Sequence, residues 1–359
     1  MSVPTIANTR FQRELSKSVM ATQAIGGGGF LGRYIVEALL ARGERNVAIF
    51  DIRQSYSLAN AKFHIGDITN IDNVNEACQG KSVVIHCASP IHGADATIYR
   101  KVNVDGTRNV IDACVKQGVR KLVYTSSASV IYNGNDLHGA DETVPICEVP
   151  MDAYNDTKAQ AEVMVLAANA KGNLLTTALR PSGVFGPRDT QVSYGMVQAA
   201  KRGQTGFMLG DNSTLFDFTY VENVAHAHIL AADKLEASGV AGEVFIITND
   251  EPMFFWDMPK ALWAGLGHKN TMGIRIPFPI AFFIAYIVDF FVWVLRPIKK
   301  LDPTFTVFRI TLFARNRYFS CEKAKKRLGY KPPVTMEEGI RRTVEYWKEV
   351  ERSKTTKSE

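Results

Sequence analysis

The stretch Gly26-Gly27-Gly28-Gly29-Phe30-Leu31-Gly32 decides the fold of this chain. The glycines at positions 26, 29 and 32 have GxxGxxG spacing, directly after a β-rich run (residues 19–25) and at the start of a run with helical spacing (residues 31–42). At such a junction the amides and dipole of the helix N-terminus can hold a pyrophosphate, and glycine lets the backbone approach it. The stretch therefore predicts a βαβ unit that binds a dinucleotide.

The pattern around this unit predicts the fold class. From Ser18 to about Leu179, short β-rich runs alternate with amphipathic helical stretches, which is the arrangement of a parallel sheet with helices on both faces. The predicted strands are residues 19–25, 47–50, 62–65, 83–86, 121–125 and 174–179. The predicted helices are residues 31–42, 71–78, 99–117 and 153–170. We expect an α/β fold with a doubly wound parallel sheet of the Rossmann type, whose first strand is unusually polar for a buried position.

The chain divides into two unequal parts. Residues 18–180 carry the alternating pattern and are predicted to form the dinucleotide-binding domain. Proline and glycine become more frequent afterwards, so residues 181–351 are predicted to form a smaller, C-terminal substrate-binding lobe. The segments expected to return to the main sheet are residues 224–232 and 244–247. Residues 1–17 and 352–359 are polar and are predicted to be disordered.

Composition excludes several classes of protein. The net charge is +6, but Lys and Arg are scattered and no basic patch interleaved with aromatic residues occurs, so we expect no nucleic-acid binding. Five dispersed cysteines, none spaced as C-x-x-C, encode neither a disulfide framework nor a zinc site, and no metal is expected. Residues 1–17 carry no apolar stretch typical of a secretory signal, so the catalytic part is expected to face the cytosol.

Asp51 predicts which dinucleotide is bound. It ends the second predicted strand, about twenty residues after the glycines, where a carboxylate accepts hydrogen bonds from ribose hydroxyls and repels a 2′-phosphate. NAD is therefore favoured over NADP. Arg53 leaves NADP open, because a nearby guanidinium can bind that phosphate, although a solvated loop arginine is the favoured interpretation.

Tyr154 and Lys158 predict hydride-transfer chemistry. Residues i and i+4 share a helix face, so the Lys158 ammonium can lie beside the Tyr154 phenol and favour its phenolate. A tyrosine that normally titrates near pH 10 then becomes a proton acceptor at neutral pH. Ser126-Ser127-Ala128-Ser129 follows the strand at residues 121–125, where a serine can hold a substrate hydroxyl toward Tyr154. We expect two of the three serines only to cap the strand end.

These features resemble the 3β-hydroxysteroid dehydrogenase family of extended short-chain dehydrogenases/reductases. Further matching motifs, in family order over most of the chain, are Gly66-Asp67-Ile68, His86-Cys87-Ala88-Ser89-Pro90, Asn103-Val104-Asp105-Gly106-Thr107, Tyr124-Thr125-Ser126-Ser127, Leu179-Arg180-Pro181 with Gly186-Pro187, and Asp217-Phe218-Thr219-Tyr220-Val221 with Asn223-Val224. Arg315-Asn316-Arg317-Tyr318-Phe319 and Leu328-Gly329-Tyr330 make the pattern most similar to the fungal sterol-4α-carboxylate 3-dehydrogenases (decarboxylating).

The resemblance implies a role for each matching residue. Tyr154 would be the proton acceptor, Lys158 would bind the nicotinamide ribose and lower the tyrosine pKa, and Ser127 would orient the substrate hydroxyl. The residues implied in NAD binding are Gly26, Gly29, Phe30, Leu31, Gly32, Asp51, Asp67, Ile68, Ala88, Asn103, Tyr154 and Lys158. Asp51 would contact the adenine ribose, and Asp67 with Ile68 the adenine side.

The implied reaction is the oxidation of a 3β-hydroxyl in a 4α-carboxysterol by NAD, as in ergosterol-type sterol biosynthesis. The product is a ketone β to a carboxylic acid, which loses carbon dioxide through an enolate. Arg188 or Arg317 are the candidates for holding the carboxylate, although surface ion pairing is the favoured interpretation of both. Partner proteins would be other sterol C4-demethylation enzymes, and a homodimer is left open.

Residues 276–295 form an apolar segment that core packing explains poorly. Pro277 and Pro279 are expected to shorten its helix to about sixteen residues, near 24 Å, less than the roughly 30 Å of a hydrocarbon core, and Asp289 adds a further penalty. We therefore expect the segment to dip into one leaflet of the endoplasmic-reticulum membrane, with a buried helix as the alternative. The residues suited to the interface and headgroups are Tyr286, Trp293, Arg296, Lys299 and Lys300.

Several functions stay open on the sequence alone. The same chemistry on a triterpenoid of a fungal secondary pathway cannot be separated from the sterol reaction. A steroid dehydrogenase/isomerase, a nucleotide-sugar epimerase and an NADPH-dependent flavonol-type reductase are further alternatives; Asp51 argues against the reductase and the apolar segment against a sugar substrate. A non-catalytic NAD-binding scaffold is the alternative from another class, against which Ser127, Tyr154 and Lys158 argue.

Overall fold

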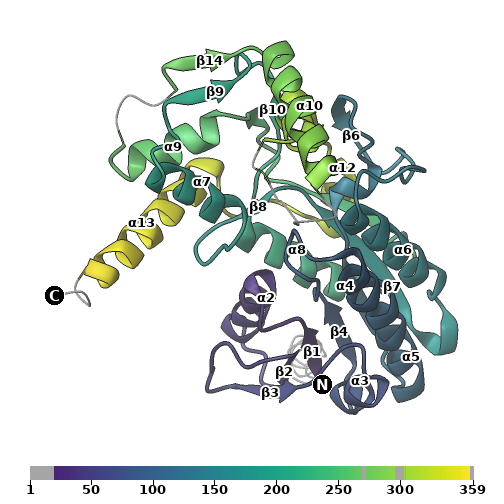
Figure 1. The fold of residues 1–359 in the computed structure, drawn as a ribbon. Coiled ribbons are helices and arrows are strands. Elements are labelled where there is room, and N and C mark those ends of the chain that lie inside the picture. Colours follow the sequence, from purple (N-terminus) through teal and green to yellow (C-terminus); the bar gives the residue numbers. More distant parts are fainter. Residues whose placement is uncertain (1–19, 269–271, 296–302, 304, 356–359) are drawn as a thin grey trace, which may run out of the picture.

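The computed structural model describes residues 20–268, 272–295, 303 and 305–355. A seven-stranded sheet forms the larger part of the molecule (Figure 1), with every neighbouring pair of strands parallel. Its strands, in spatial order, are β12 (Val244–Ile247), β7 (Leu175–Pro181), β5 (Lys121–Thr125), β4 (Val83–His86), β1 (Thr22–Ile25), β2 (Val47–Asp51) and β3 (Ala61–Ile65). Strands are added in one direction from β1 to β3 and in the other direction from β4 onward, so the strand order switches between β1 and β4. Ligands of such folds bind at this switch point. The predicted doubly wound α/β fold is confirmed.

Helices cover both faces of this sheet. One face packs against α2 (Phe30–Ala41), α8 (Val221–Lys234) and α12 (Glu322–Leu328), and the other against α3 (Ile71–Cys78), α5 (Thr107–Gln117) and α6 (Ala153–Ala167). Successive strand residues point to opposite faces, so Ala24 and Ile25 enter different core clusters. The two apolar layers fix the sheet edge that carries the candidate site.

The first strand shows how a polar run is accommodated in the core. β1 covers only residues 22–25 of the predicted 19–25, and all four of its residues are buried. Thr22 donates a 3.1 Å hydrogen bond to Glu44, while neither polar atom of the Gln23 side chain has a hydrogen-bond partner among the described residues. Pairing with strands on both sides satisfies the backbone of β1, so the strand forms although the buried Gln23 amide has a cost.

The predicted helix at residues 99–117 is interrupted. It consists of α4 (Ala96–Tyr99), a π-helical segment η1 (Arg100–Gly106) and α5. Gly106 ends the π-helical segment, and a Cβ at this position would lie 2.9 Å from Cγ2 of Ile68. Close packing against Ile68 therefore accounts for the glycine in the helix interior.

A smaller lobe is built mainly from the second half of the chain (Figure 1). Its four-stranded sheet has the order β13 (Met253–Phe254), β10 (Leu215–Phe216), β15 (Arg317–Phe319) and β6 (Leu137–Ala140). The remaining strand pairs are β8 (Val184–Phe185) with β11 (Thr219–Tyr220), and β9 (Phe207–Leu209) with β14 (Ile274–Ile276). The helices of the lobe are α7 (Val192–Lys201), α9 (Asp257–Gly265), α10 (Phe278–Leu295), α11 (Val307–Ala314) and α13 (Met336–Thr355). Short 3₁₀ helices are η2 (Ala128–Ile131) and η3 (Lys171–Asn173).

The two predicted disordered termini have different outcomes. Residues 1–17 lie outside the described residues. α13 continues to Thr355, so the tail expected to be disordered from residue 352 is helical over residues 352–355. Arg352 and Lys354 lie in its last turn, where positive charge interacts favourably with the helix dipole, and Lys201 pairs with Glu351 at 3.1 Å. These interactions were not apparent in the composition of the tail.

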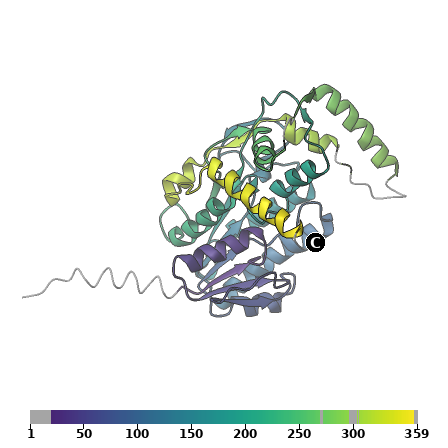
Figure 2. The same cartoon turned by 90° about the vertical axis from the view of Figure 1, so that its left-hand side faces the viewer.

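Helix α10 is the apolar segment predicted at residues 276–295, and it projects beyond the rest of the molecule (Figure 2). It starts at Phe278, so Pro279 lies in the first turn, where a missing N–H costs nothing, and the helix has 18 residues rather than about sixteen. Only Ala281 and Ala285 are buried. The alternative of a buried helix is therefore wrong. Arg296, Lys299 and Lys300 lie outside the described residues.

By length and composition alone, α10 is the one helix of the described part that could cross a membrane, with a mean hydropathy of 2.2. Its most exposed side chains are large and apolar or aromatic. They include Phe283 at 67 %, Tyr286 at 64 % and Trp293 at 70 % exposed. This exceeds the scattered single hydrophobic residues normal for a protein surface and marks a surface suited to an apolar phase.

Candidate active site

The glycine-rich loop joins β1 to α2 at the carboxyl edge of the sheet. Gly26 has a φ of 83°, and a Cβ there would lie 2.5 Å from Cα of Ala88. A Cβ at Gly32 would collide with the carbonyl oxygen of Gly26. Both positions therefore require glycine, the first for its backbone conformation and the second for the close approach of helix and loop. Ala88 takes part by packing against the loop.

The N-terminus of α2 is arranged to receive an anion. Gly29 is the N-cap residue and makes no side-chain capping bond, and Phe30 and Leu31 form the first turn. Amides in a first helical turn have no intrahelical acceptor, so they remain available to a ligand. Phe30 packs edge-to-face against Tyr34 with ring centroids 5.9 Å apart, which fixes the turn.

Asp51 lies at the end of β2, beside the glycine loop. Its Oδ2 accepts a 3.0 Å hydrogen bond from the backbone N–H of Gly28, and a Cβ at Gly28 would lie 2.8 Å from that oxygen. Burial raises the pKa of Asp51, opposed by backbone hydrogen bonds from Ile52, Gly28 and Arg53. The cradle without Cβ atoms and the adjacent carboxylate fit the pyrophosphate and ribose of a dinucleotide.

The other residues predicted to bind the cofactor have different environments. Asp67 follows β3, two residues after Ile65, which pairs with Asp51, and its Oδ1 accepts from Thr69 N at 2.9 Å. Ile68 is buried under Gly106. Asn103 lies on η1, where its Nδ2 donates to Thr157 on α6 at 3.1 Å and its buried Oδ1 has no partner in the described part of the chain.

Tyr154 and Ser127 meet where α6 begins beside the end of β5. Asp152 caps α6 by accepting a 2.8 Å hydrogen bond from Asn155 N, which places Tyr154 in the first turn. Burial raises the pKa of Tyr154 to about 12, and a hydrogen bond with Ser127 opposes that rise. Ser127 is the serine whose side chain interacts with Tyr154, whereas Ser126 is buried without a partner for its hydroxyl among the described residues.

Lys158 is directed at the end of β5. Its Nζ donates to the carbonyl oxygen of Thr125 and lies 4.4 Å from the centroid of the Tyr124 ring. Burial lowers the pKa of Lys158 to about 7, opposed by electrostatic interactions with Cys87 and Glu162. Among the described side chains, Ser127 is the one whose contact lowers the pKa of Tyr154, and the lowering expected from Lys158 stays a prediction.

Three residues of this region carried no readable signal in the sequence. His92, in the loop after β4, lies against the Tyr154 ring with centroids 4.3 Å apart, and Tyr99 lies 5.7 Å from the same ring. His228 on α8 bonds to Thr125. A lone histidine at a helical or loop position has no spacing that distinguishes it, and only the fold brings these residues to one place.

The two arginines considered for carboxylate binding differ sharply. Arg188 forms an ion pair with Glu37 at 2.8 Å, the surface pairing that we favoured. Arg317 makes no ion pair in the described ranges; its guanidinium carbon lies 4.8 Å from the Tyr132 ring centroid and 4.6 Å from that of Phe216. Burial lowers its pKa to about 10. Tyr132 closes the short helix η2 that follows Ser127, so this desolvated cation stands near the candidate site.

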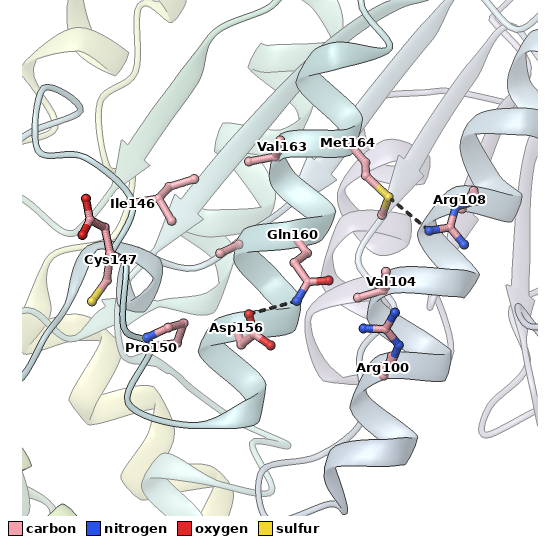
Figure 3. A pocket seen from close by; sticks show the side chains of 12 residues that line it. Arg100, Val104, Arg108, Ile146, Cys147, Pro150, Asp156, Gln160, Val163 and Met164 are labelled. Atoms are coloured by element: carbon pink, nitrogen blue, oxygen red, sulfur yellow. Dashed lines mark hydrogen bonds between the residues drawn. The ribbon is translucent and has the colours of Figure 1, made fainter.

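A cavity of about 430 Å³ lies elsewhere, between α6 and the η1–α5 segment. Figure 3 shows Asp156, Gln160 and Val163 on one side of it and Arg100 and Arg108 on the other. The α6 residues that line it lie on the helix face opposite Tyr154 and Lys158. The cavity is therefore separate from the candidate active site.

Comparison with known proteins agrees with this geometry. Residues 23–278 match the model of the 3-beta hydroxysteroid dehydrogenase/isomerase family. The chain is 46 % identical to the decarboxylating sterol-4-alpha-carboxylate 3-dehydrogenase of Saccharomyces cerevisiae, over 90 % of this chain and 97 % of the relative. It is 42 % identical to the mouse enzyme of the same name, over 97 % of this chain and 96 % of the relative.

A solved structure of UDP-glucose 4-epimerase from Thermotoga maritima shares the fold. Its TM-score is 0.72 at 23 % identity, over 92 % of this chain and 99 % of the epimerase chain. At this identity the likeness concerns the fold only. The family match, the two relatives and the arrangement of Ser127, Tyr154 and Lys158 agree, and the chain belongs to the 3-beta hydroxysteroid dehydrogenase/isomerase family.

Proposed function

We propose that this protein oxidises the 3β-hydroxyl of a 4α-carboxysterol with NAD, and that the product loses its C4 carboxyl group as carbon dioxide. The observation that carries the proposal is the meeting of Ser127 and Tyr154 at the sheet edge that also holds the glycine loop. The names of the relatives at 46 % and 42 % identity support the sterol carboxylate as substrate.

NAD is the proposed cofactor. The Gly26–Gly32 loop and the first-turn amides of α2 would hold the pyrophosphate, and Asp51 would accept hydrogen bonds from the adenine ribose. Asp67 and Ile68 would lie on the adenine side. When bound, NAD accepts a hydride, and its oxidised ring is a cation.

Tyr154 would accept the proton of the 3β-hydroxyl as the C3 hydride leaves. Its pKa of about 12 means that the phenol needs a positive neighbour to act at neutral pH. Lys158 on the same helix face would supply part of that charge and would bind the nicotinamide ribose. Ser127, hydrogen-bonded to Tyr154, would orient the substrate hydroxyl.

Arg317 is the proposed partner of the C4 carboxylate. Its half-buried guanidinium lies between two aromatic rings and has no ion-pair partner in the described part of the chain, so a substrate carboxylate would supply the missing counter-charge. After oxidation at C3 the molecule is a β-keto acid, which loses carbon dioxide to leave an enolate. Arg317 would hold the carboxylate until that bond breaks, and protonation of the enolate gives the ketone.

Helix α10 would bring the protein to its substrate. Its exposed apolar side chains are suited to one leaflet of the endoplasmic-reticulum membrane, with Tyr286 and Trp293 at the interface. A sterol dissolves in the bilayer, so docking there would place the lobe beside the substrate. The catalytic domain would face the cytosol.

The reaction is tested by mixing purified protein, NAD and a 4α-carboxysterol in detergent and following NADH and carbon dioxide together. We expect both to form in equal amounts, and Tyr154→Phe to abolish both while it still binds NAD. NADH without carbon dioxide would reduce the function to a plain 3β-dehydrogenase. If neither NADH nor carbon dioxide forms, the proposal is contradicted.

Membrane docking is tested by flotation with vesicles of endoplasmic-reticulum lipid composition. Replacement of Phe283, Phe290 and Trp293 by Ser should abolish co-flotation, because these three exposed side chains supply much of the apolar surface of α10. Val149→Ser is the matched control, since Val149 is 79 % exposed on another part of the molecule. Unchanged flotation of the triple variant would refute docking through α10.

A further inference from the structure

Behind Lys158 lies a chain of buried hydrogen bonds that leads to helix α8. The Lys158 ammonium donates to the carbonyl oxygen of Thr125, the last residue of β5. The hydroxyl of the same threonine lies 2.6 Å from Nε2 of His228, and Nδ1 of His228 lies 2.8 Å from the carbonyl oxygen of Val224. His228 is 0 %, Lys158 2 % and Thr125 8 % exposed, so water does not compete for these bonds.

The partners of His228 determine its tautomer. A carbonyl oxygen can only accept, so Nδ1 carries the proton and donates it to Val224. Burial holds the pKa of His228 down to about 4, and the ring is therefore neutral at physiological pH. Nε2 is then an acceptor, and the Thr125 hydroxyl is its donor. Both ring nitrogens are engaged in a fixed direction.

We propose that His228 is a positioning residue for Lys158: by accepting from the Thr125 hydroxyl it fixes the Thr125 carbonyl that receives the lysine ammonium. This inference rests on the dehydrogenase activity proposed above. His228 lies 70 positions after Lys158, in the second half of the chain. The positioning of Lys158 therefore depends on a residue outside the part of the sequence that carries Ser127 and Tyr154. The hydrogen bonds of His228 go to Thr125 and Val224, so it acts on Lys158 through Thr125.

Without this support the ammonium of Lys158 loses its carbonyl acceptor. The charged form of a buried lysine is then less stable, so its pKa falls further. With less positive charge near the phenol, the phenolate of Tyr154 becomes harder to form, and the acid limb of the pH profile for oxidation moves to higher pH. The titratable groups around Lys158 are His86 and Cys87 at the end of β4, His92 in the following loop, Tyr124 on β5, Tyr154 and Glu162 on α6, and His228 on α8.

The test compares two substitutions of His228, which separate the acceptor function of Nε2 from the donor function of Nδ1. His228→Gln places an acceptor near the position of Nε2 and keeps the bond from Thr125, whereas His228→Asn retains only a donor for the Val224 carbonyl. Thr125→Val removes the hydroxyl, so the backbone carbonyl is still present but its position is no longer fixed through His228. His226→Gln is the matched control, because His226 lies two residues earlier on α8 with its ring facing Tyr330.

The measurements are the pH dependence of kcat with NAD and a 4α-carboxysterol, and the dissociation constant of NADH by fluorescence. We expect His228→Asn and Thr125→Val to lower kcat about tenfold at neutral pH and to shift the acid limb upward, because a hydrogen bond to a charged group is lost. NADH binding should weaken about threefold in both. His228→Gln and His226→Gln should resemble the wild type.

A wild-type profile in Thr125→Val would overturn the proposal, and so would a His228→Gln variant as impaired as His228→Asn. If His228→Asn does not fold, Thr125→Val and His228→Gln still decide the question. Absence of wild-type turnover would contradict the sterol reaction alone, since NADH binding by the same variants still tests the network.

Discussion

The carboxylate of Asp289 accepts a 3.0 Å hydrogen bond from the backbone N–H of Val307. Asp289 belongs to the exposed apolar helix α10, and Val307 is the first residue of α11. An acidic side chain at the start of a helix satisfies an unpaired amide and interacts favourably with the helix dipole. The one acid in this apolar helix therefore faces the protein, where it joins α10 to the substrate lobe.

Replacing Asp289 by Leu separates membrane affinity from the stability of the lobe. Loss of the bond to Val307 should cost about 1 kcal/mol, the usual effect of a lost helix cap, and lower Tm by a few degrees. Flotation with vesicles should be unchanged, because the exposed face of α10 is untouched. Asp289→Asn, which keeps an acceptor, should recover most of the Tm. Stronger vesicle binding at unchanged Tm would show instead that Asp289 faces the membrane.

Arg317→Met should affect only substrates that carry a carboxylate. We expect kcat/KM for a 4α-carboxysterol to fall about a hundredfold, the usual scale for a lost charge-assisted bidentate bond, and kcat/KM for a 3β-hydroxysteroid without that group to stay the same. Arg315→Met is the control, since Arg315 pairs with Asp136 at 3.4 Å on the surface. An equal loss with both substrates would assign Arg317 to packing between Tyr132 and Phe216.

Asp51→Asn tests the preference for NAD. Asparagine can still accept from Gly28 N but no longer carries the charge that binds ribose hydroxyls and repels a phosphate. We expect the Kd for NAD to rise about tenfold. The ratio of the Kd for NADP to the Kd for NAD should fall by at least the same factor. Titration of both cofactors by protein fluorescence measures this. If the wild type binds NADP more tightly than NAD, Arg53 is favoured as a ligand of the 2′-phosphate. Arg53→Met should then remove that preference for NADP.

Lys158 is predicted to destabilise the NAD-free protein. Burial lowers its pKa from 10.5 to about 7, so between these pH values the unfolded chain binds more protons than the folded one. The contribution of Lys158 to the free energy of unfolding is therefore low at neutral pH, and it rises as the pH increases from about 7 to 10.5. Lys158→Met should raise Tm at pH 7 and flatten its rise toward pH 10, while activity is lost. The same pH dependence of Tm in both proteins would contradict the lowered pKa.

The sequence predicted most of the sheet well because strands such as β4, β5 and β12 are short, largely apolar runs that are mostly buried. β4, β5 and β12 have the predicted limits, and α3 does too. Differences occur where tertiary contacts decide: Gly106 must pack against Ile68, which interrupts the predicted helix at 99–117, and Pro279 fits within the first turn of α10.

Motifs located Ser127, Tyr154 and Lys158 but not the direction of the lysine side chain. Helical spacing places Lys158 near Tyr154, yet the carbonyl of Thr125 and the ring of Tyr124 compete for its ammonium. That competition depends on the end of β5, a strand distant in sequence. For the same reason His228 was unreadable, since its role arises only when α8 packs behind β5.

The most direct test of the account uses a 4α-carboxysterol with deuterium at the 3α position, together with NAD and the full-length enzyme. The account predicts that deuterium appears in the reduced cofactor, that carbon dioxide is released in equal amount, and that Tyr154→Phe gives neither. Reduced cofactor without deuterium, or complete retention of the label at C3, would contradict hydride transfer from the 3β-hydroxyl carbon to NAD.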